Sequence, residues 1–591
     1  MTGRFEAVAP ADAASPPPQL DPSLLRLPYR LRLGVTGHRR IDDPDGVRAA
    51  VHRLLDHLAR VLAADGRVDL EWTVVSPLAK GADRIVAEAV LGHGAALRQP
   101  QLEVLAPLPL DDYRADFDTE TDRHEFETLL ARASSLTELN AETEDRRDPD
   151  VRNRCYRDGG QAVVRACEIL IAIWDGTPAR GEGGTGDVVR YAVDRGRVVL
   201  WIRADQPSAD ARLLAPPRRW LPAALRRAPH RVVRLPARPK RLSPGLHQLA
   251  AFLRDAVVPA RCLRDALATA QDSFREAARR AGLPAAYVEP IARRLTPYFV
   301  RADALADAYR RRHTAALETA LYLAATAVTS VALQVLFVPE SQAPMAVEVA
   351  SMLGILVALA LNRRQAWHEK WVNDRYLAEH LRTATHVLVL GEDPSARAAT
   401  VARILPFYAG PKSWLPSAVA SVVQAARPAS LTDELHEPAR TMIADAWLLE
   451  QRGWHARNAK RKERSYRRRH ALVVALFAAT LTAATLHLLG VGHRHAGPPL
   501  LSASAWCTFL AIALPAWATA IHAVGKQLEY ERVAARSKQM EGVLERLSLS
   551  ARQTRSLDAL RDVVQEATQV VGLENHEWSV LLSFAPPELA V

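Results

Sequence analysis

Cysteine is scarce in this sequence, and the few thiols show no pattern. Cys155, Cys167, Cys262 and Cys507 form no CxxC pair and no even framework, so the sequence predicts neither a zinc site nor a disulfide scaffold, and reduced cytosolic thiols are the simplest interpretation. The N-terminal stretch also lacks a basic segment followed by an apolar one, unlike a secretory signal peptide. We expect 1–29, which is rich in Ala, Pro and Asp, to be a disordered leader.

Acidic residues are too few to balance the basic ones. The 591 residues include 77 Lys and Arg against 66 Asp and Glu, which gives a net charge of +11. The excess lies beside long apolar runs and in a Pro/Arg-rich stretch near 205–245, and basic clusters beside apolar runs suit anionic lipid headgroups. Nucleic acid is the alternative partner for so basic a chain, but the placement of the charges favours lipid. A chain of this length needs several cores, so we expect three or four domains.

The five residues Tyr-Arg-Arg-Arg-His occur twice, at 309–313 and at 466–470, which is an offset of 157 positions. Each copy precedes two apolar runs that are separated by a turn-forming stretch. The same offset aligns 374–375 (Asp-Arg) with 531–532 (Glu-Arg). We therefore predict duplication of one unit, made of a basic helix, a two-helix hairpin and a polar helix.

The four apolar runs have the length of membrane-spanning helices. About 20 apolar residues cross a hydrocarbon core of about 30 Å, and only the second run is marginal. Arg and Lys flank the outer ends of both hairpins, whereas the tips carry Arg494 as a fixed positive charge. The positive-inside rule therefore places both termini in the cytoplasm, with the chain in the inner (plasma) membrane. The alternative, an Ala-rich soluble bundle, does not explain basic flanks on one side. The predicted spans are 316–338, 345–361, 471–491 and 500–524.

The segment 30–205 has a different pattern, in which short apolar strands alternate with helices. The alternation predicts an α/β domain with a parallel, doubly wound, Rossmann-like sheet, followed by an all-α membrane region with four transmembrane helices in two hairpins. The expected strands are 31–35, 70–75, 102–105, 169–174 and 198–202. Beyond this domain we expect a Pro/Arg-rich linker at 206–245, a helical region with the first hairpin at 246–400, a linker at 401–440, and the second hairpin with a cytosolic C-terminal helix at 441–591.

Three of the predicted strands end in small or polar residues where a helix begins. Ligands bind at the carboxyl ends of the strands in such a sheet. Glycines there admit a phosphate, helix N-termini offer it free amides, and nearby carboxylates accept from ribose hydroxyls or a base. Glycine at one such turn is often structural, so the three turns together predict the site, with no catalytic residue and no metal. The candidate ligand-binding residues are Gly37, His38, Arg39, Ser76, Lys80, Gly81, Asp83, Asp175, Gly176, Gly183, Gly184, Thr185, Gly186 and Asp187.

The motifs at 34–39, 78–83, 108–113, 174–176 and 183–192 resemble, in order, those of the SLOG superfamily, which includes the DprA and LOG proteins. The resemblance covers roughly 30–205 and implies a Rossmann-like fold that binds nucleotides or their derivatives. LOG hydrolases carry a catalytic Glu after a Gly-Gly-x-Gly-Thr motif, and Arg190 stands at that position here. The resemblance therefore implies binding without hydrolysis, although Asp187 or Glu182 would be placed to substitute for the acid.

The hairpins and their flanking helices resemble SLATT domains, two-transmembrane modules of bacterial conflict systems that are described as pore-forming effectors. The two resemblances together imply an effector of antiviral defence, in which a cytosolic domain senses a nucleotide-derived ligand. That domain would gate pore formation or membrane disruption by a homo-oligomer. Two alternatives remain open: a membrane-tethered hydrolase of the N-glycosidic bond of a nucleotide, and DNA binding like that of DprA.

Overall fold

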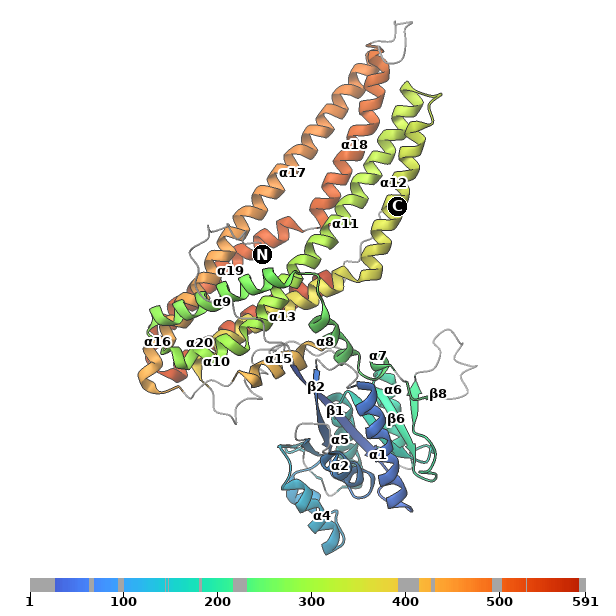
Figure 1. Cartoon of the computed structure of the whole chain (residues 1–591), viewed down its shortest axis with the longest axis vertical. Helices are drawn as coiled ribbons and strands as arrows, with labels where there is room; N and C mark the ends of the chain where they lie inside the picture. The colour runs from blue at the N-terminus through green and yellow to red at the C-terminus, as the bar shows by residue number, and fades with distance from the viewer. Residues whose placement is uncertain are drawn as a thin grey trace. The chain divides into compact units, whose positions relative to one another are not determined.

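The structure is a computed structural model (Figure 1), and its residues form two compact units that we describe one at a time. The sheet unit comprises the described residues of Leu20–Asp255 and Tyr408–Val422, and the helical unit comprises those of Ala256–Phe407 and Val423–Val591. Most of the predicted leader and part of the predicted linker 401–440 lie outside the described residues. The residues that the structure describes are 27–62, 68–93, 100–143, 145–146, 148–179, 183–215, 231–236, 238–391, 414–426, 431–491, 502–527 and 529–583.

The sheet unit contains one eight-stranded sheet with the strand order β4-β3-β2-β1-β5-β6-β7-β8. The first six strands pair in parallel, and β7 and β8 add an antiparallel edge. This is the doubly wound, Rossmann-like fold that the sequence predicted. The strands are β1 (Leu27–Gly37), β2 (Val68–Ser76), β3 (Gln101–Ala106), β4 (Ser135–Glu138), β5 (Ile169–Trp174), β6 (Val198–Arg203), β7 (Arg212–Ala215) and β8 (Arg231–Arg234).

The helices of this unit bury one apolar side each, as their sequence period requires. In α1 (Pro44–Leu62) the buried side includes Val47, Val51 and Leu55. The start of α5 (Pro149–Ala166) follows from its first residues, because the Asp148 carboxylate accepts from the amides of Asp150 and Val151 and proline occupies the first turn. The other helices are α2 (Ala82–Gly92), α3 (Leu110–Arg114), α4 (Glu120–Leu130), α6 (Thr185–Asp194), α7 (Pro239–Leu242), α8 (Pro244–Arg254) and α15 (Leu415–Ala425, which belongs to this unit up to Val422).

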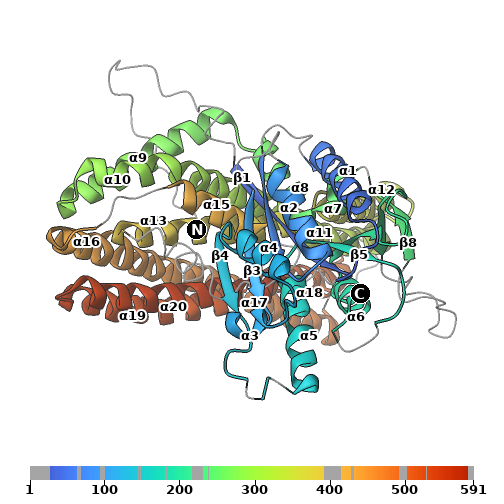
Figure 2. The same cartoon turned by 90° about the horizontal axis from the view of Figure 1, so that it is seen from below.

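The helical unit consists of two long hairpins above a set of shorter helices (Figure 1). The hairpins pack through α11 and α18, where Nε1 of Trp517 donates to Oγ1 of Thr329 over 3.1 Å. Figure 2 shows α19 beside α20, and these two helices are in contact. The elements are α9 (Ala260–Ala281), α10 (Ala285–Arg294), α11 (Thr296–Phe337), α12 (Ala343–Gln365), α13 (Trp367–Val387), η3 (Leu388–Leu390), η5 (Asp433–Leu435), α16 (His436–Thr441), the π-helix η6 (Met442–Leu449), α17 (Glu450–Leu488), α18 (Ala503–Gln527), α19 (Tyr530–Gln553) and α20 (Leu557–Ser583).

Among the described residues, four helices of this unit are long and apolar enough to cross a membrane, and each overlaps one of the predicted spans, with 345–361 wholly inside its helix. Only 11% of the apolar stretch of α12 is buried, so its large side chains face outward, as at Leu356, which is 64% exposed. A soluble bundle would instead bury such residues in its interior. The finding identifies a membrane protein. The tip of the second hairpin, including the first two residues of the predicted span 500–524, lies outside the described residues.

The two hairpins share one order of elements, but their helix breaks do not follow the predicted offset of 157. Each hairpin has a non-glycine residue in the left-handed conformation just before its polar helix, Ala366 (φ 50°) and Glu529 (φ 46°), which are 163 positions apart. Buried residues of α19 fall on buried residues of the first hairpin at an offset of 157 and also at this offset of 163. The pairs at the offset of 163 are Ser537 with Asp374, Met540 with Leu377, Leu544 with Leu381, Leu547 with Ala384, Ser548 with Thr385, and Ala551 with Leu388.

The helix breaks therefore depart by six residues from the predicted alignment of 374–375 with 531–532. Between the Tyr-Arg-Arg-Arg-His motif and the helix break, the second hairpin is six residues longer than the first. The shared order of elements fits the predicted duplication.

Candidate functional site

The strand order defines where a ligand would bind in the sheet unit. From β1 the chain passes to β2 on one side, and after β4 it returns to place β5 on the other side of β1. The carboxyl ends of β1 and β5 therefore lie together at the topological switch point, the usual ligand position of a doubly wound sheet. Gly37 and Trp174 are the last residues of these two strands.

The loop after β1 is held by backbone hydrogen bonds to β5 and to the start of α2. The amide of His38 donates to the carbonyl of Ile173 over 3.1 Å, and the amide of Ala82 donates to the carbonyl of His38 over 3.1 Å. A Cβ atom on Gly81 (φ +86°) would lie 2.5 Å from the Arg39 carbonyl oxygen, and one on Gly37 would lie 2.3 Å from Cβ of Ala82. These two candidate glycines therefore allow three loops to pack closely, which is a structural role.

Arg39 is an exposed cation of this loop, and an aromatic ring supports it. Its guanidinium carbon lies 5.0 Å from the centre of the Tyr156 ring, a distance at which a cation is attracted to the ring face. Tyr156 is itself held, because its hydroxyl donates to Asp116, which also accepts from Arg152 over 2.5 Å. Tyr156 is not among the residues predicted from the sequence. The Asp148-Pro149 start signal predicts the helix that carries it, but the contact with Arg39 forms only in the fold.

The N-terminus of α6 lies against the same part of α5. A Cβ on Gly183 (φ +81°) would lie 2.7 Å from the amide nitrogen of Arg157, and one on Gly186 would lie 2.9 Å from that of Ala179. Gly184 is the N-cap residue, and in the described part of the chain no side chain caps the helix there. Because α5 carries Tyr156 and Arg157 next to each other, the N-terminus of α6 and Arg39 are grouped around one turn of this helix.

Two candidate carboxylates already have partners within the chain. Asp187, near the start of α6, accepts from Arg190 over 2.6 Å. Asp175 accepts from the amide of Thr177 at 2.9 Å and from its hydroxyl at 2.8 Å, and Nε2 of His38 lies 3.2 Å from its carboxylate. Burial raises the pKa of Asp175, but the Thr177 hydrogen bonds and His38 outweigh it, so the pKa is lowered overall. Asp175 is therefore an ionised group that fixes its loop.

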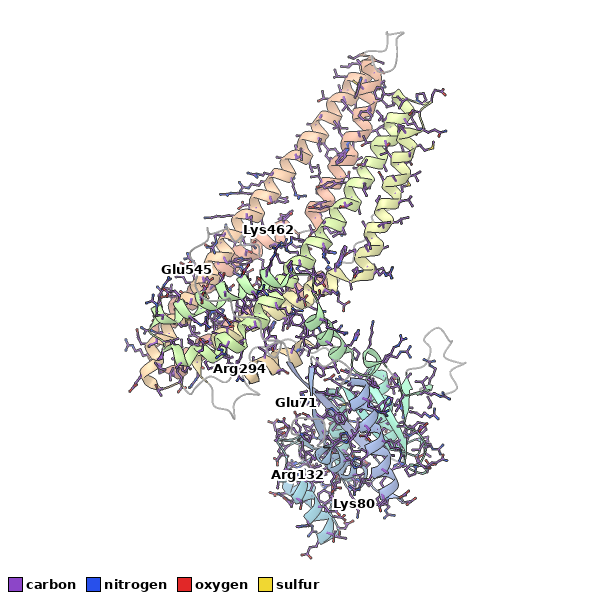
Figure 3. All side chains as sticks on the ribbon, in the orientation of Figure 1. Glu71, Lys80, Arg132, Arg294, Lys462 and Glu545 are labelled. Carbon is purple, nitrogen blue, oxygen red and sulfur yellow. The ribbon has the colours of Figure 1, made fainter. Side chains whose placement is uncertain are left out.

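Two candidates in the turn before α2 are internal, and a third is paired. Ser76 is buried and accepts from the amide of Leu78 over 3.0 Å. Asp83 is 5% exposed, and it accepts from the amide of Ala79 over 3.3 Å. Burial raises its pKa to about 7, although the Ala79 amide, Arg39 and Arg84 act in the opposite direction. Lys80, labelled in Figure 3, donates to Asp122 of α4 over 2.8 Å.

Most of the predicted residues fall into two groups. Gly37, Ser76, Gly81, Asp83 and Asp175 shape the loops. The surface left for a ligand consists of the Arg39 guanidinium and the uncapped start of α6 at 183–186, which together suit an anion. Gly176 (φ +90°) turns the chain after β5, and a Cβ atom added there would lie 3.5 Å from the Trp201 ring. Glu182, the other substitute acid considered from the sequence, lies outside the described residues.

No family model matches this chain, and no curated protein matches its sequence. Among the described residues, no group of three or more His, Cys, Asp or Glu is arranged to hold a metal ion. The site is therefore assessed from its own geometry.

Proposed function

We propose that this protein is a ligand-gated membrane effector of bacterial defence. Its sheet unit is a SLOG-like domain that binds a nucleotide-derived anion at the switch point. Its two SLATT-like hairpins cross the inner membrane with both termini in the cytoplasm, and a homo-oligomer opens a pore or disrupts the bilayer. The ligand gates this step because it binds two arrangements of the chain with different affinity.

One observation carries the proposal: an uncapped helix start beside a ring-supported arginine occurs on the same chain as four outward-facing apolar helices. The amides at the start of α6 and the positive end of its dipole stabilise a phosphate. Arg39 adds a full charge and a planar pair of donors. Of the two substitute acids that sequence reasoning left open, Asp187 is paired with Arg190, which does not favour a catalytic role, and Glu182 lies outside the described residues.

Leakage from liposomes tests the whole proposal. Full-length protein is reconstituted in vesicles that contain a self-quenched dye, and a panel of nucleotides and nucleotide derivatives is added. We expect one class of nucleotide to release dye with the wild type and with the control Arg60→Ala on α1, but not with Arg39→Ala. No release with any compound, or equal release from both variants, would contradict the proposal.

Calorimetric titration of the full-length protein in detergent tests the anion site directly. In Gly184→Asp the new carboxylate lies at the N-cap, where it accepts from the free amides of α6 and repels a phosphate. We expect binding to be abolished while the helix remains folded. Gly184→Ala is the control, because the φ of −65° at this position admits a side chain. Unchanged affinity in Gly184→Asp would move the site elsewhere.

The hydrolase alternative has one observation in its favour. A carboxyl group with a pKa of about 7, such as Asp83, can exchange a proton near neutral pH, as a general acid or base must. Its burial and its bond to Ala79 limit access to a substrate. Mass spectrometry of nucleotides incubated with the full-length protein tests this alternative. Release of a free base by the wild type but not by Asp83→Asn would establish hydrolysis.

A further inference from the structure

The helical unit contains a cavity of about 690 Å³ at the end of the hairpins that carries the Tyr-Arg-Arg-Arg-His motifs. Both copies contribute to it, α11 and α13 from the first and α17 and α19 from the second, and α20 completes the wall. Leu317, one of its lining residues, is also among the first residues of the predicted span 316–338. The cavity therefore reaches from the polar helices to the level at which the apolar segments begin.

The charged side chains that line the cavity form ion pairs with one another, except for one cation. Five basic side chains and four carboxylates line the cavity, and each arginine has a carboxylate partner. The pairs are Arg310 with Asp307 (2.9 Å), Arg375 with Glu379, Arg532 with Glu529 (3.0 Å) and Arg536 with Glu574 (3.9 Å). Lys462, labelled on α17 in Figure 3, is the remaining cation, and no carboxylate among the described residues pairs with it.

The surroundings of Lys462 are cationic and aromatic. Its ammonium nitrogen lies 4.7 Å from the centre of the Tyr530 ring, and the Arg469 guanidinium lies 5.4 Å from the same ring. Burial, followed by repulsion from Arg310, Arg461 and Arg469, lowers the pKa of Lys462 to about 8. A half-buried ammonium among cations is unfavourable unless an anion is close.

A second polar side chain of the same lining, His455, has a ring nitrogen without a hydrogen-bond partner among the described residues. His455 is 5% exposed, and its Nδ1 has no hydrogen-bond partner in the part of the chain that the structure describes. Its Nε2 lies 3.8 Å from Glu574, beyond hydrogen-bond distance. Buried imidazole nitrogens are normally paired. Nδ1 has almost no accessible surface in this arrangement, so it reaches a bound group only when the ring turns; with its proton on Nδ1, the turned neutral ring would donate to an oxygen of that group.

We propose that this cavity binds a phosphate ester, with the Lys462 ammonium as the charge partner and His455 as a hydrogen-bond donor to the phosphoryl oxygens. The remaining lining includes Trp371 and Trp454 and the aliphatic side chains of Leu317 and Leu544, which suit the organic part of the ester. The ester is either the headgroup of a membrane phospholipid or a soluble phosphate. Because both copies line the cavity, a bound ester ties the two hairpins together at this end.

Thermal unfolding of the full-length protein in a neutral detergent tests the site. The probes are phosphatidate in mixed micelles, phosphatidylcholine in the same micelles as the reference, and glycerol 3-phosphate and inorganic phosphate in solution. Lys462→Gln removes the charge. Lys460→Gln is the matched control, because Lys460 is an exposed lysine of the same helix that does not line the cavity.

We expect phosphatidate or a soluble phosphate to raise the melting temperature of the wild type and of Lys460→Gln. In Lys462→Gln the affinity for that probe falls about tenfold or more, as the loss of one charge-assisted contact predicts. A shift with phosphatidate alone identifies the lipid as the source, and a shift with the water-soluble probes identifies a soluble ester. Equal shifts in the two lysine variants, or no shift with any phosphate, would overturn the proposal.

His455→Phe provides an independent check, since it keeps an aromatic ring and removes Nδ1. We expect this variant to fold, because it replaces an unpaired buried polar atom with an apolar one, and to bind the same probe more weakly than the wild type. Affinity equal to that of the wild type would remove His455 from the site. The outcome does not depend on nucleotide binding by the sheet unit, so the two proposals can fail separately.

Discussion

The substitution Asp83→Asn should make the stability of the sheet unit less dependent on pH. The carboxyl group titrates at about 7 in the folded protein and at 3.8 without the protein environment. As the pH rises through this window the unfolded chain loses its proton first, so the folded state binds more protons and its stability falls. Above pH 7 both states are ionised and the effect is complete.

The size of this change in stability follows from the difference between the folded and unfolded pKa values of Asp83. Each pKa unit corresponds to about 1.4 kcal/mol, so between pH 5 and pH 7 the wild type should lose about 3 kcal/mol of local stability through Asp83. The asparagine of the variant would have no proton to lose, and its side-chain oxygen can still accept from the Ala79 amide. We therefore expect Asp83→Asn to be more stable than the wild type at pH 8 by about this amount or more.

Hydrogen exchange measured by mass spectrometry can follow β1 and β2 separately from the helical unit. After correction for intrinsic rates, the opening equilibrium of these strands in the wild type should increase by about a hundredfold from pH 5 to pH 8, and that of Asp83→Asn should change much less. The same pH dependence in both proteins would refute the assignment of a raised pKa to Asp83.

Two further predictions concern backbone packing and the membrane. Gly81→Ala forces a side chain into a φ of +86° with its Cβ 2.5 Å from a carbonyl oxygen, so we expect destabilisation by about 1–3 kcal/mol or more in chemical denaturation; an unchanged midpoint would show that the loop can move apart. Leu356→Lys places a charge in the middle of a predicted span and should cost about 2.5–3.5 kcal/mol in an insertion assay, whereas Leu549→Lys, on α19 outside the spans and also exposed, should insert normally.

The central strands could be predicted because they are buried on both faces. All six residues of β5 are buried, and such a strand is visible as a continuous apolar run. The four residues of β4 are all exposed, and they carry no apolar pattern, so an edge strand of this kind is specified by pairing with β3 and not by its own composition. The antiparallel strands β7 and β8 are equally short and lie within the stretch predicted to be a linker.

The candidate site could be located from the sequence, but the roles of its residues could not. Strand ends marked one edge of the sheet, and the strand order brings the ends of β1 and β5 together there. Whether Gly81 faces a ligand or a neighbouring carbonyl depends on the distance between two loops, which the sequence does not contain. The pairing of Asp187 with Arg190 could have been predicted from the sequence, since residues three apart on a helix are neighbours. The support of Arg39 by Tyr156 joins segments too distant in the chain for such reasoning.

The helix breaks also show where the two hairpins differ. Position 458 corresponds to 301 by the motif offset, and position 537 corresponds to 374 counted from the breaks. The neutral hydrogen bond between Asn458 and Ser537 (2.9 Å) therefore occupies the place of two buried ionisable residues, Arg301 and Asp374. A buried charge is costly once its partner is lost, whereas a neutral hydrogen bond costs less to break. The bases of the two hairpins therefore depend on different kinds of interaction.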